Sequence, residues 1–214
     1  MQAAVQIEGL KRNNIGDVFQ ALAVADHLKQ DYAVLDREKL SNPHSTQPLL
    51  LFANGWYMHD YSAFPPASNI KPVYVSVHFS NCEILNMKNN REHFRKHGPI
   101  GARDLKTLIM LRAAGIPSYY SGCFTVALKR RNPNEVPEDF LIVDGIDHPL
   151  SKASTNAIER AVGMQSKRVS HDPPSQNLSF ESYQRTAFKH AEELLSRYRS
   201  EEHTSELQSL SHIS

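Results

Sequence analysis

Cysteine is nearly absent from this chain of 214 residues, which contains only Cys82 and Cys123. Two cysteines cannot form the disulfide framework of a small secreted domain, and they fit a reducing compartment. The chain also lacks an apolar run near the ~20 residues of a membrane-spanning helix. No apolar segment follows the basic residues near its start, as it would in a signal peptide. We therefore expect a cytoplasmic protein without a membrane span.

Neither sign of charge predominates. The 24 lysine and arginine residues stand against 23 aspartate and glutamate residues, a formal net charge of +1 with histidine neutral. Because nucleic-acid binding usually needs a basic field, we expect no nucleic-acid partner. With 40% hydrophobic residues, the chain has enough apolar material for one large or two small folded domains.

The segment 199–214 differs from the rest of the chain. It is polar, shows no helical periodicity, and begins with eleven residues that match a sequencing adapter translated in frame. An ordinary polar tail is the alternative. We interpret 199–214 as a non-native tail, exclude it from fold reasoning and expect the native protein to have continued beyond Tyr198. Without this tail the balance is 23 basic to 20 acidic residues, or +3.

Short apolar segments alternate with amphipathic ones along the remaining chain. Strands are expected at 3–9, 32–35, 49–53, 72–79, 118–120 and 140–143, and helices at 18–29, 91–96, 104–115, 155–162 and 179–198. This alternation predicts an α/β fold with a mostly parallel sheet. The charged, proline-containing linker 130–139 separates a first lobe, 1–129, from a partial second lobe, 140–198.

Ligands of such proteins bind where the strands end at one edge of the sheet, and four groups of residues fall there. The first contains Asn14, Gly16, Asp17 and Gln20, at an N-x-G-D turn before an expected helix. Backbone N–H groups at a helix start favour an anion or a polar ligand. A simple turn with Asp17 as the helix N-cap explains the same residues.

The second group, Asn54 and Gly55 with Trp56, Tyr57 and His59, follows the expected strand 49–53. Aromatic area and polar donors beside a glycine suit a sugar or another ring-bearing ligand. Packing of an aromatic loop onto the protein body is the alternative.

The third group is His78 with Ser80 and Asn81, at the end of the most strand-like segment of the chain. A histidine at this position suits a general acid or a group that donates to phosphate. A structural histidine with satisfied hydrogen bonds is the alternative.

The fourth group is Arg103 with the turn Ser121-Gly122-Cys123. Arg103 stands immediately before an expected helix, so its guanidinium and the helix dipole suit one anion, unless a local carboxylate pairs with it. Cys123 has no histidine or aspartate nearby in sequence to activate it, and we interpret it as a packing residue. The chain has no metal-ligand spacing, Walker loop or G-x-G-x-x-G motif.

The order of these motifs resembles that of the polysaccharide pyruvyl transferase family. The resemblance covers residues 13–128 well and 129–198 loosely, and its most distinctive parts are G-x-R-D at 101–104 and S-G-C-x-T at 121–125. It implies two Rossmann-like lobes in a GT-B-like arrangement with the site between them. It also implies transfer of a pyruvyl group from phosphoenolpyruvate, the donor substrate, to a sugar hydroxyl pair of a cell-surface polysaccharide, which forms a ketal. No separate cofactor is implied.

The resemblance also implies roles for the four groups of residues. Arg103 belongs to the cations that hold the donor, and the remaining candidates line the cleft; these are Asn14, Gly16, Asp17, Gln20, Asn54, Gly55, His78, Ser121 and Gly122. Family members carry their general-acid histidine in an Arg-Leu-His-like motif after a helix resembling 180–198, and this chain has no such motif there. We therefore assign no catalytic residue and expect the chain as given to be inactive. A GT-B-like glycosyltransferase using a nucleotide sugar and a non-enzymatic glycan-binding fragment stay as alternatives.

Overall fold

The computed structural model describes residues 1–7, 15–42, 46–128, 139–144, 150–170 and 178–197. The chain divides into two compact units. Unit 1 contains residues 1–12 and 17–128, and unit 2 contains residues 13–16 and 129–214. The predicted linker 130–139 lies outside the described ranges except for Asp139, which begins a strand. The interpretation of 199–214 as a non-native tail also concerns residues outside these ranges.

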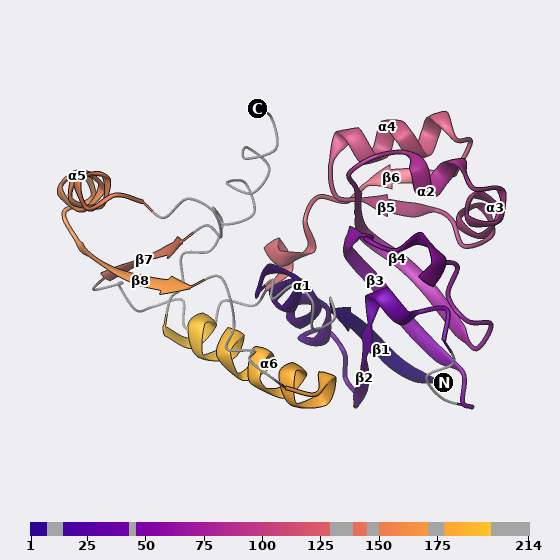
Figure 1. Cartoon of the computed structure of the whole chain (residues 1–214), viewed down its shortest axis with the longest axis horizontal. Helices are drawn as coiled ribbons and strands as arrows, with labels where there is room; N and C mark the ends of the chain where they lie inside the picture. Colours follow the sequence, from indigo (N-terminus) through magenta and orange to yellow (C-terminus); the bar gives the residue numbers. More distant parts are fainter. Residues whose placement is uncertain (8–14, 43–45, 129–138, 145–149, 171–177, 198–214) are drawn as a thin grey trace. The chain divides into compact units, whose positions relative to one another are not determined.

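Unit 1 is built on a six-stranded parallel sheet. Its strands are β1 (Gln2–Ile7), β2 (Tyr32–Asp36), β3 (Leu49–Tyr57), β4 (Ile70–Phe79), β5 (Ile100–Ala102) and β6 (Ser118–Tyr120). They lie in the order β2-β1-β3-β4-β5-β6, and each neighbouring pair is parallel (Figure 1). The predicted α/β fold with a parallel, Rossmann-like sheet is therefore confirmed for unit 1.

Helices flank this sheet. They are α1 (Ile15–Ala25), α2 (Glu83–Asn86), α3 (Lys88–Lys96) and α4 (Leu105–Ala113), with short 3₁₀ segments η1 (Arg37–Lys39), η2 (Tyr61–Ala63) and η3 (Phe124–Ala127). Helix α4 lies within the predicted helix 104–115. The Asp104 carboxylate accepts a hydrogen bond from the backbone N–H of Thr107, and Gly115 adopts a left-handed φ of 66° just past the helix.

Unit 2 contains β7 (Asp139–Asp144), α5 (Lys152–Val162), β8 (Gln165–Ser170) and α6 (Phe180–Arg197). Strands β7 and β8 pair in parallel, so β7, α5 and β8 form a βαβ unit. Helix α6 buries side chains at helical spacing, namely Tyr183, Ala187, Ala191 and Leu194. Strand β8 was not predicted, because its polar sequence has no apolar alternation.

The aromatic core of unit 1 packs between the sheet and α3. Tyr57 of β3 and Phe79 of β4 are fully buried, and Phe94 of α3 lies with its ring centroid 5.4 Å from that of Phe79. Phe64 stacks on Phe94 at 4.8 Å. Helix α1 contacts β3 through Asn54, whose side-chain amide donates to the Gln20 carbonyl oxygen at 2.7 Å.

Two sequence-based boundaries were wrong at functionally interesting points. Strand β3 continues to Tyr57, so Asn54 and Gly55 lie within the strand and not in a loop after it. The pairing with β4 resumes after a register shift between Ala53 and Asn54, and it carries Tyr57 into the core. Helix α1 begins at Ile15, so Asp17 lies in its first turn and is not its N-cap.

A half-buried histidine lies beside the aromatic core. The Nε2 atom of His93 is 2.9 Å from the Tyr74 hydroxyl oxygen, and its ring centroid is 5.0 Å from that of Phe64. Burial, together with the smaller effects of the neighbouring His97 and Lys96, lowers the pKa of His93 to about 4. The imidazole is therefore neutral in the folded protein under conditions where an exposed histidine is charged.

We expect His93 to make the folded state less stable in acid. Its pKa of about 4 in the folded protein lies below the ordinary value of 6.5. As the pH falls, the unfolded chain therefore binds a proton at this side chain before the folded protein does. This stability contribution is complete above pH 6.5 and is lost as the pH falls toward 4. We expect a loss of about 2 kcal/mol, after discounting for partial exposure.

Urea unfolding of the wild type and of His93→Gln at about pH 7 and about pH 4.5 measures this loss. The variant is expected to lose less stability between the two conditions, whereas His59→Gln, at an exposed position, retains the wild-type difference. An unchanged pH dependence in His93→Gln would contradict the assignment.

Candidate functional site

The direction of chain progression through the sheet reverses between β1 and β3. From β1 the chain turns to β2 on one side, and from β3 it advances through β4, β5 and β6 on the other. Ligands of open parallel sheets bind at the carboxyl ends of the strands near such a reversal. Polar side chains occupy that edge from β1 to the start of α4, and we take this band as the candidate site.

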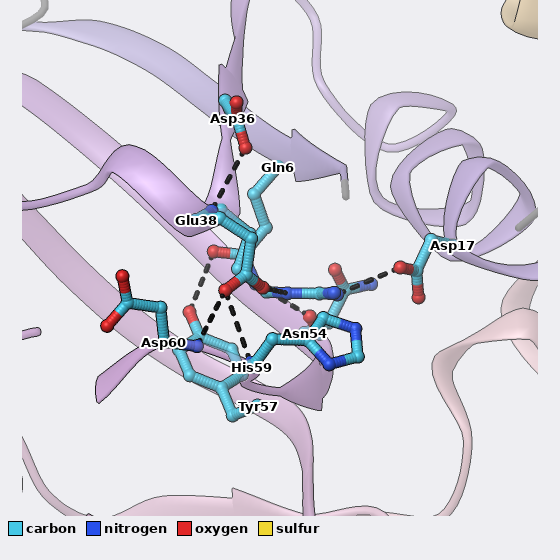
Figure 2. A network of polar contacts seen from close by, with 9 residues as sticks. Gln6, Asp17, Asp36, Glu38, Asn54, Tyr57, His59 and Asp60 are labelled. Atoms are coloured by element: carbon cyan, nitrogen blue, oxygen red, sulfur yellow. Dashed lines mark hydrogen bonds and ion pairs between the residues drawn. The ribbon is translucent and has the colours of Figure 1, made fainter. Parts of the chain in front are cut away.

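A buried hydrogen-bond network joins β1, β3 and α1 at the reversal (Figure 2). The Gln6 side-chain amide donates to the Asn54 carbonyl oxygen at 2.8 Å and accepts from the Tyr57 hydroxyl at 2.7 Å. Asn54 in turn donates through Nδ2 to the Gln20 carbonyl oxygen at 2.7 Å. Burial raises the pKa of Tyr57, so its hydroxyl stays protonated and acts as a donor. The strand ends are thus held in one arrangement.

Arg37 is the charged centre of the same region, and it is 1% exposed. Its Nη1 atom lies 2.9 Å from Oδ2 of Asp17, and its Nε atom lies 3.1 Å from Oε1 of Glu38. The guanidinium carbon also lies 5.6 Å from the Trp56 ring centroid. Two carboxylates therefore compensate one buried cation, and the role of the Asp17 carboxylate is to pair with Arg37.

Glu38 connects Arg37 to the segment after β3. Its second carboxylate oxygen accepts hydrogen bonds from the backbone N–H groups of His59 at 3.2 Å and Asp60 at 3.1 Å. The His59 ring packs against Trp56 at a centroid distance of 4.0 Å. The aromatic side chain of Trp56 is thus engaged by protein groups, as in the structural alternative considered for this segment.

The close approach of β3 to α1 depends on Gly55, whose φ is +86°. A Cβ atom there would lie 2.8 Å from Oε1 of Gln20 and 3.5 Å from Oδ1 of Asp17. Among the described residues, the side-chain oxygens of Gln20 and Asn54 are buried without a hydrogen-bond partner. Both atoms are hydrogen-bond acceptors that no described group uses. Gly16 lies in the first turn of α1, and Asn14 lies outside the described residues.

His78 continues the band on β4, directly opposite Trp56 in the register of β3 and β4. Its Nδ1 atom lies 2.6 Å from Oδ2 of Asp104, the residue that caps α4. Thr107 supports the same carboxylate with its backbone N–H at 2.8 Å and its hydroxyl at 3.0 Å. Burial opposes ionisation of Asp104, but the hydrogen bonds from His78 and Thr107 outweigh it and lower the pKa of this carboxyl group.

Arg103 lies next to His78 across the strands. Its backbone N–H donates to the Val77 carbonyl oxygen at 2.8 Å, and its side chain is half-buried. The neighbouring carboxylate, Asp104, is engaged by His78. Within the described part of the chain, the Arg103 guanidinium forms no ion pair or hydrogen bond, so the structure shows no local carboxylate pairing with it.

The turn after β6 is tied to the strands by its hydroxyl groups. Ser76 of β4 donates to the Gly122 carbonyl oxygen at 2.8 Å, and Ser121 donates to the Ala102 carbonyl oxygen at 2.9 Å. Gly122 has a φ of +71°. The Cys123 sulfur lies 3.1 Å from the Thr125 hydroxyl oxygen. Both Ser121 and Gly122 thus have structural hydrogen bonds at the site edge.

No protein-family model, curated protein or solved structure matches this chain. Among the described residues, no three histidine, cysteine, aspartate or glutamate side chains are grouped as a metal ion would require. In the same part of the chain, no helix has the length and apolar character needed to cross a membrane. The function must therefore be argued from the geometry of the strand ends.

We expect Arg37 to be essential for the stability of unit 1. Arg37→Ala leaves the Asp17 carboxylate buried without its cation, at a cost of about 3–5 kcal/mol. Lys39→Ala is the matched control, because Lys39 lies on the same 3₁₀ segment and also pairs with a carboxylate, that of Asp36. Its side chain, however, is 60% exposed. The control is expected to cost less than about 1 kcal/mol. Urea unfolding measures both changes, and equal losses would contradict a central role for Arg37.

We also expect Gly101 of the G-x-R-D motif to be required by packing. A Cβ atom there would lie 2.5 Å from the Val75 carbonyl oxygen and 2.9 Å from the Tyr119 hydroxyl oxygen. Gly101→Ala must therefore displace β4 from β5, at a cost of about 3 kcal/mol or more. Gly122→Ala meets no atom within 4 Å, and its positive φ costs about 1 kcal/mol. Thermal unfolding of both variants tests this difference, and a stable Gly101→Ala protein would contradict it.

Proposed function

We propose that this chain is a polysaccharide pyruvyl transferase-like protein, and that unit 1 binds its donor, phosphoenolpyruvate, at the ends of β4 and β5. The single observation that carries the proposal is the half-buried Arg103 guanidinium, which has no partner among the described residues. It stands at the start of α4, where the helix dipole favours negative charge. Phosphoenolpyruvate carries a phosphate and a carboxylate, and arginine is well suited to bind both.

The proposed reaction makes a ketal from the donor and two hydroxyl groups of one sugar. A proton is added to the methylene carbon of phosphoenolpyruvate, and a sugar hydroxyl oxygen attacks the adjacent carbon. Phosphate leaves, and the second hydroxyl closes the ring. Of the two hydroxyl protons, one balances the proton gained by carbon and the other balances the departing phosphate. Acid–base assistance of this kind contributes ~10²–10⁴-fold to the rate.

The β1/β3 side of the band supports a polyhydroxylated acceptor. The buried side-chain oxygens of Gln20 and Asn54 are hydrogen-bond acceptors, which match the donors of a sugar of a cell-surface polysaccharide. In this proposal, unit 2 belongs to a second Rossmann-like lobe of a GT-B-like protein. The βαβ unit of β7, α5 and β8 supports this assignment, because it is the repeating element of such lobes.

Calorimetric titration of the chain with phosphoenolpyruvate tests donor binding. We expect millimolar or tighter binding that weakens by about tenfold or more in Arg103→Ala, because a charge-assisted contact is lost. Arg112→Ala is the matched control, since this exposed arginine lies in the last turn of α4. It is expected to bind the donor like the wild type.

Equal binding by Arg103→Ala and the wild type would remove Arg103 from the donor site. Titration with a nucleotide sugar such as UDP-glucose provides the second comparison. Binding of the nucleotide sugar without binding of phosphoenolpyruvate would overturn the proposal in favour of a glycosyltransferase.

A further inference from the structure

We propose that His78 and Asp104 form a proton-linked phosphate subsite, in which Nε2 of His78 binds a phosphate group and gains a proton on binding. The choice of phosphoenolpyruvate as the natural ligand rests on the proposed function. The subsite itself is defined by its own geometry and can be probed with inorganic phosphate alone.

One ring nitrogen of His78, Nδ1, faces Asp104. The 2.6 Å distance from Nδ1 of His78 to Oδ2 of Asp104 is that of a strong, charge-assisted hydrogen bond. Two further hydrogen bonds from Thr107 fix the carboxylate, and the lowered pKa of Asp104 keeps it ionised. An ionised carboxylate only accepts hydrogen bonds, so Nδ1 of His78 must carry a proton.

The other nitrogen of the His78 ring is Nε2. A neutral imidazole with its proton on Nδ1 presents an unprotonated Nε2, which accepts hydrogen bonds but donates none. Among the described residues, no hydrogen bond involves the Nε2 atom of His78. The side chain is 20% exposed, so a ligand can reach it. An unprotonated phosphate oxygen, such as those of a phosphate ester dianion, can bind at Nε2 only if this nitrogen becomes protonated.

A bound phosphate favours protonation of Nε2 for an electrostatic reason. The imidazolium would lie between the Asp104 carboxylate and the phosphate dianion, and each of these stabilises its positive charge. Lys106 donates from Nζ to the Ser80 carbonyl oxygen at 2.7 Å, and Arg103 is bonded through its backbone to Val77. The Lys106 ammonium and the backbone of Arg103 therefore lie near the end of β4, and the positive charges of both residues attract the anion.

The remaining charged groups around His78 come from two other segments. Glu83 follows β4 at the start of α2. On the opposite side, Trp56 lies between His78 and two further groups, Arg37 and His59. Arg37 is itself paired with Asp17 and Glu38. The groups of the site that are free to offset a phosphate are thus on the His78–Arg103 side of the band.

The test is calorimetric titration with inorganic phosphate and with phosphoenolpyruvate in two buffers that differ in ionisation enthalpy. At about pH 7.5 we expect net proton uptake when the ligand binds, and weaker binding as the pH rises further. His78→Gln is expected to abolish the uptake, and His97→Gln, a histidine on the chain segment after α3, is expected to retain it.

The positioning role of Asp104 has a readout of its own. Nitrogen NMR of the His78 ring in the free protein is expected to show the proton on Nδ1, and added phosphate is expected to protonate Nε2. In Asp104→Asn the preference for Nδ1 is expected to be lost, and proton uptake is expected to fall. A free ring with its proton on Nε2 in the wild type would overturn the proposal.

The outcomes separate this subsite from the proposed function. Binding of phosphoenolpyruvate that depends on Arg103 but occurs without proton uptake overturns the subsite and leaves the proposed function standing. Proton-linked binding of inorganic phosphate without binding of phosphoenolpyruvate supports the subsite and overturns the proposed donor. An absence of binding by either anion overturns both.

Discussion

The pairing of β3 with β4 is the constraint on which the other features of unit 1 depend. After the register shift at Ala53 and Asn54, this pairing places Tyr57 opposite Phe79 and Trp56 opposite His78. The first pair enters the aromatic core, while the second lies at the carboxyl edge among polar groups. Because neighbouring residues of a strand face opposite sides, a slip of β3 by one residue would turn Trp56 toward the core and Tyr57 toward the polar side. Burial of the core pair therefore also fixes the position of His78.

Two arginines at this edge illustrate how the surroundings decide the role of a charged side chain. Arg37 is buried between the carboxylates of Asp17 and Glu38, so its charge is compensated within the protein. The carboxylate of Asp104, which follows Arg103 in the chain, is instead engaged by His78 and Thr107. Within the described ranges, the charge of Arg103 is thus left without a protein partner. The difference arises from the allocation of carboxylates, because both residues follow strands of the same sheet.

Much of unit 1 could be predicted because its signals are local. Apolar runs marked the strands, and Asp104 and Gly115 marked the ends of α4. Strand β3 was predicted too short because Asn54-Gly55 resembles a turn, whereas burial of Tyr57 outweighs that preference. In this strand, packing against the rest of the sheet decided a boundary that the local residues did not.

The candidate site was only partly predictable, because its contacts join distant residues. Arg37 was missed since D-R-E-K at 36–39 is typical of a solvated surface, and its main partner, Asp17, lies 20 residues earlier. The D-R-E-K segment does follow a strand at the carboxyl edge, which was the available signal. His78 and Arg103 were identified from their positions at strand ends, but the bond from His78 to the cap of α4 required the folded structure.

Asp104 is at once the cap of α4 and the partner of the His78 imidazole. One oxygen of its carboxylate accepts from the Thr107 N–H, and the other faces Nδ1 of His78. A change in the charge of the ring therefore alters the strength of the bonds that begin the helix. A ligand bound at His78 can thereby change the rigidity of the first turn of α4. Asparagine in place of Asp104 would preserve the cap but not this coupling, which separates helix initiation from ligand response.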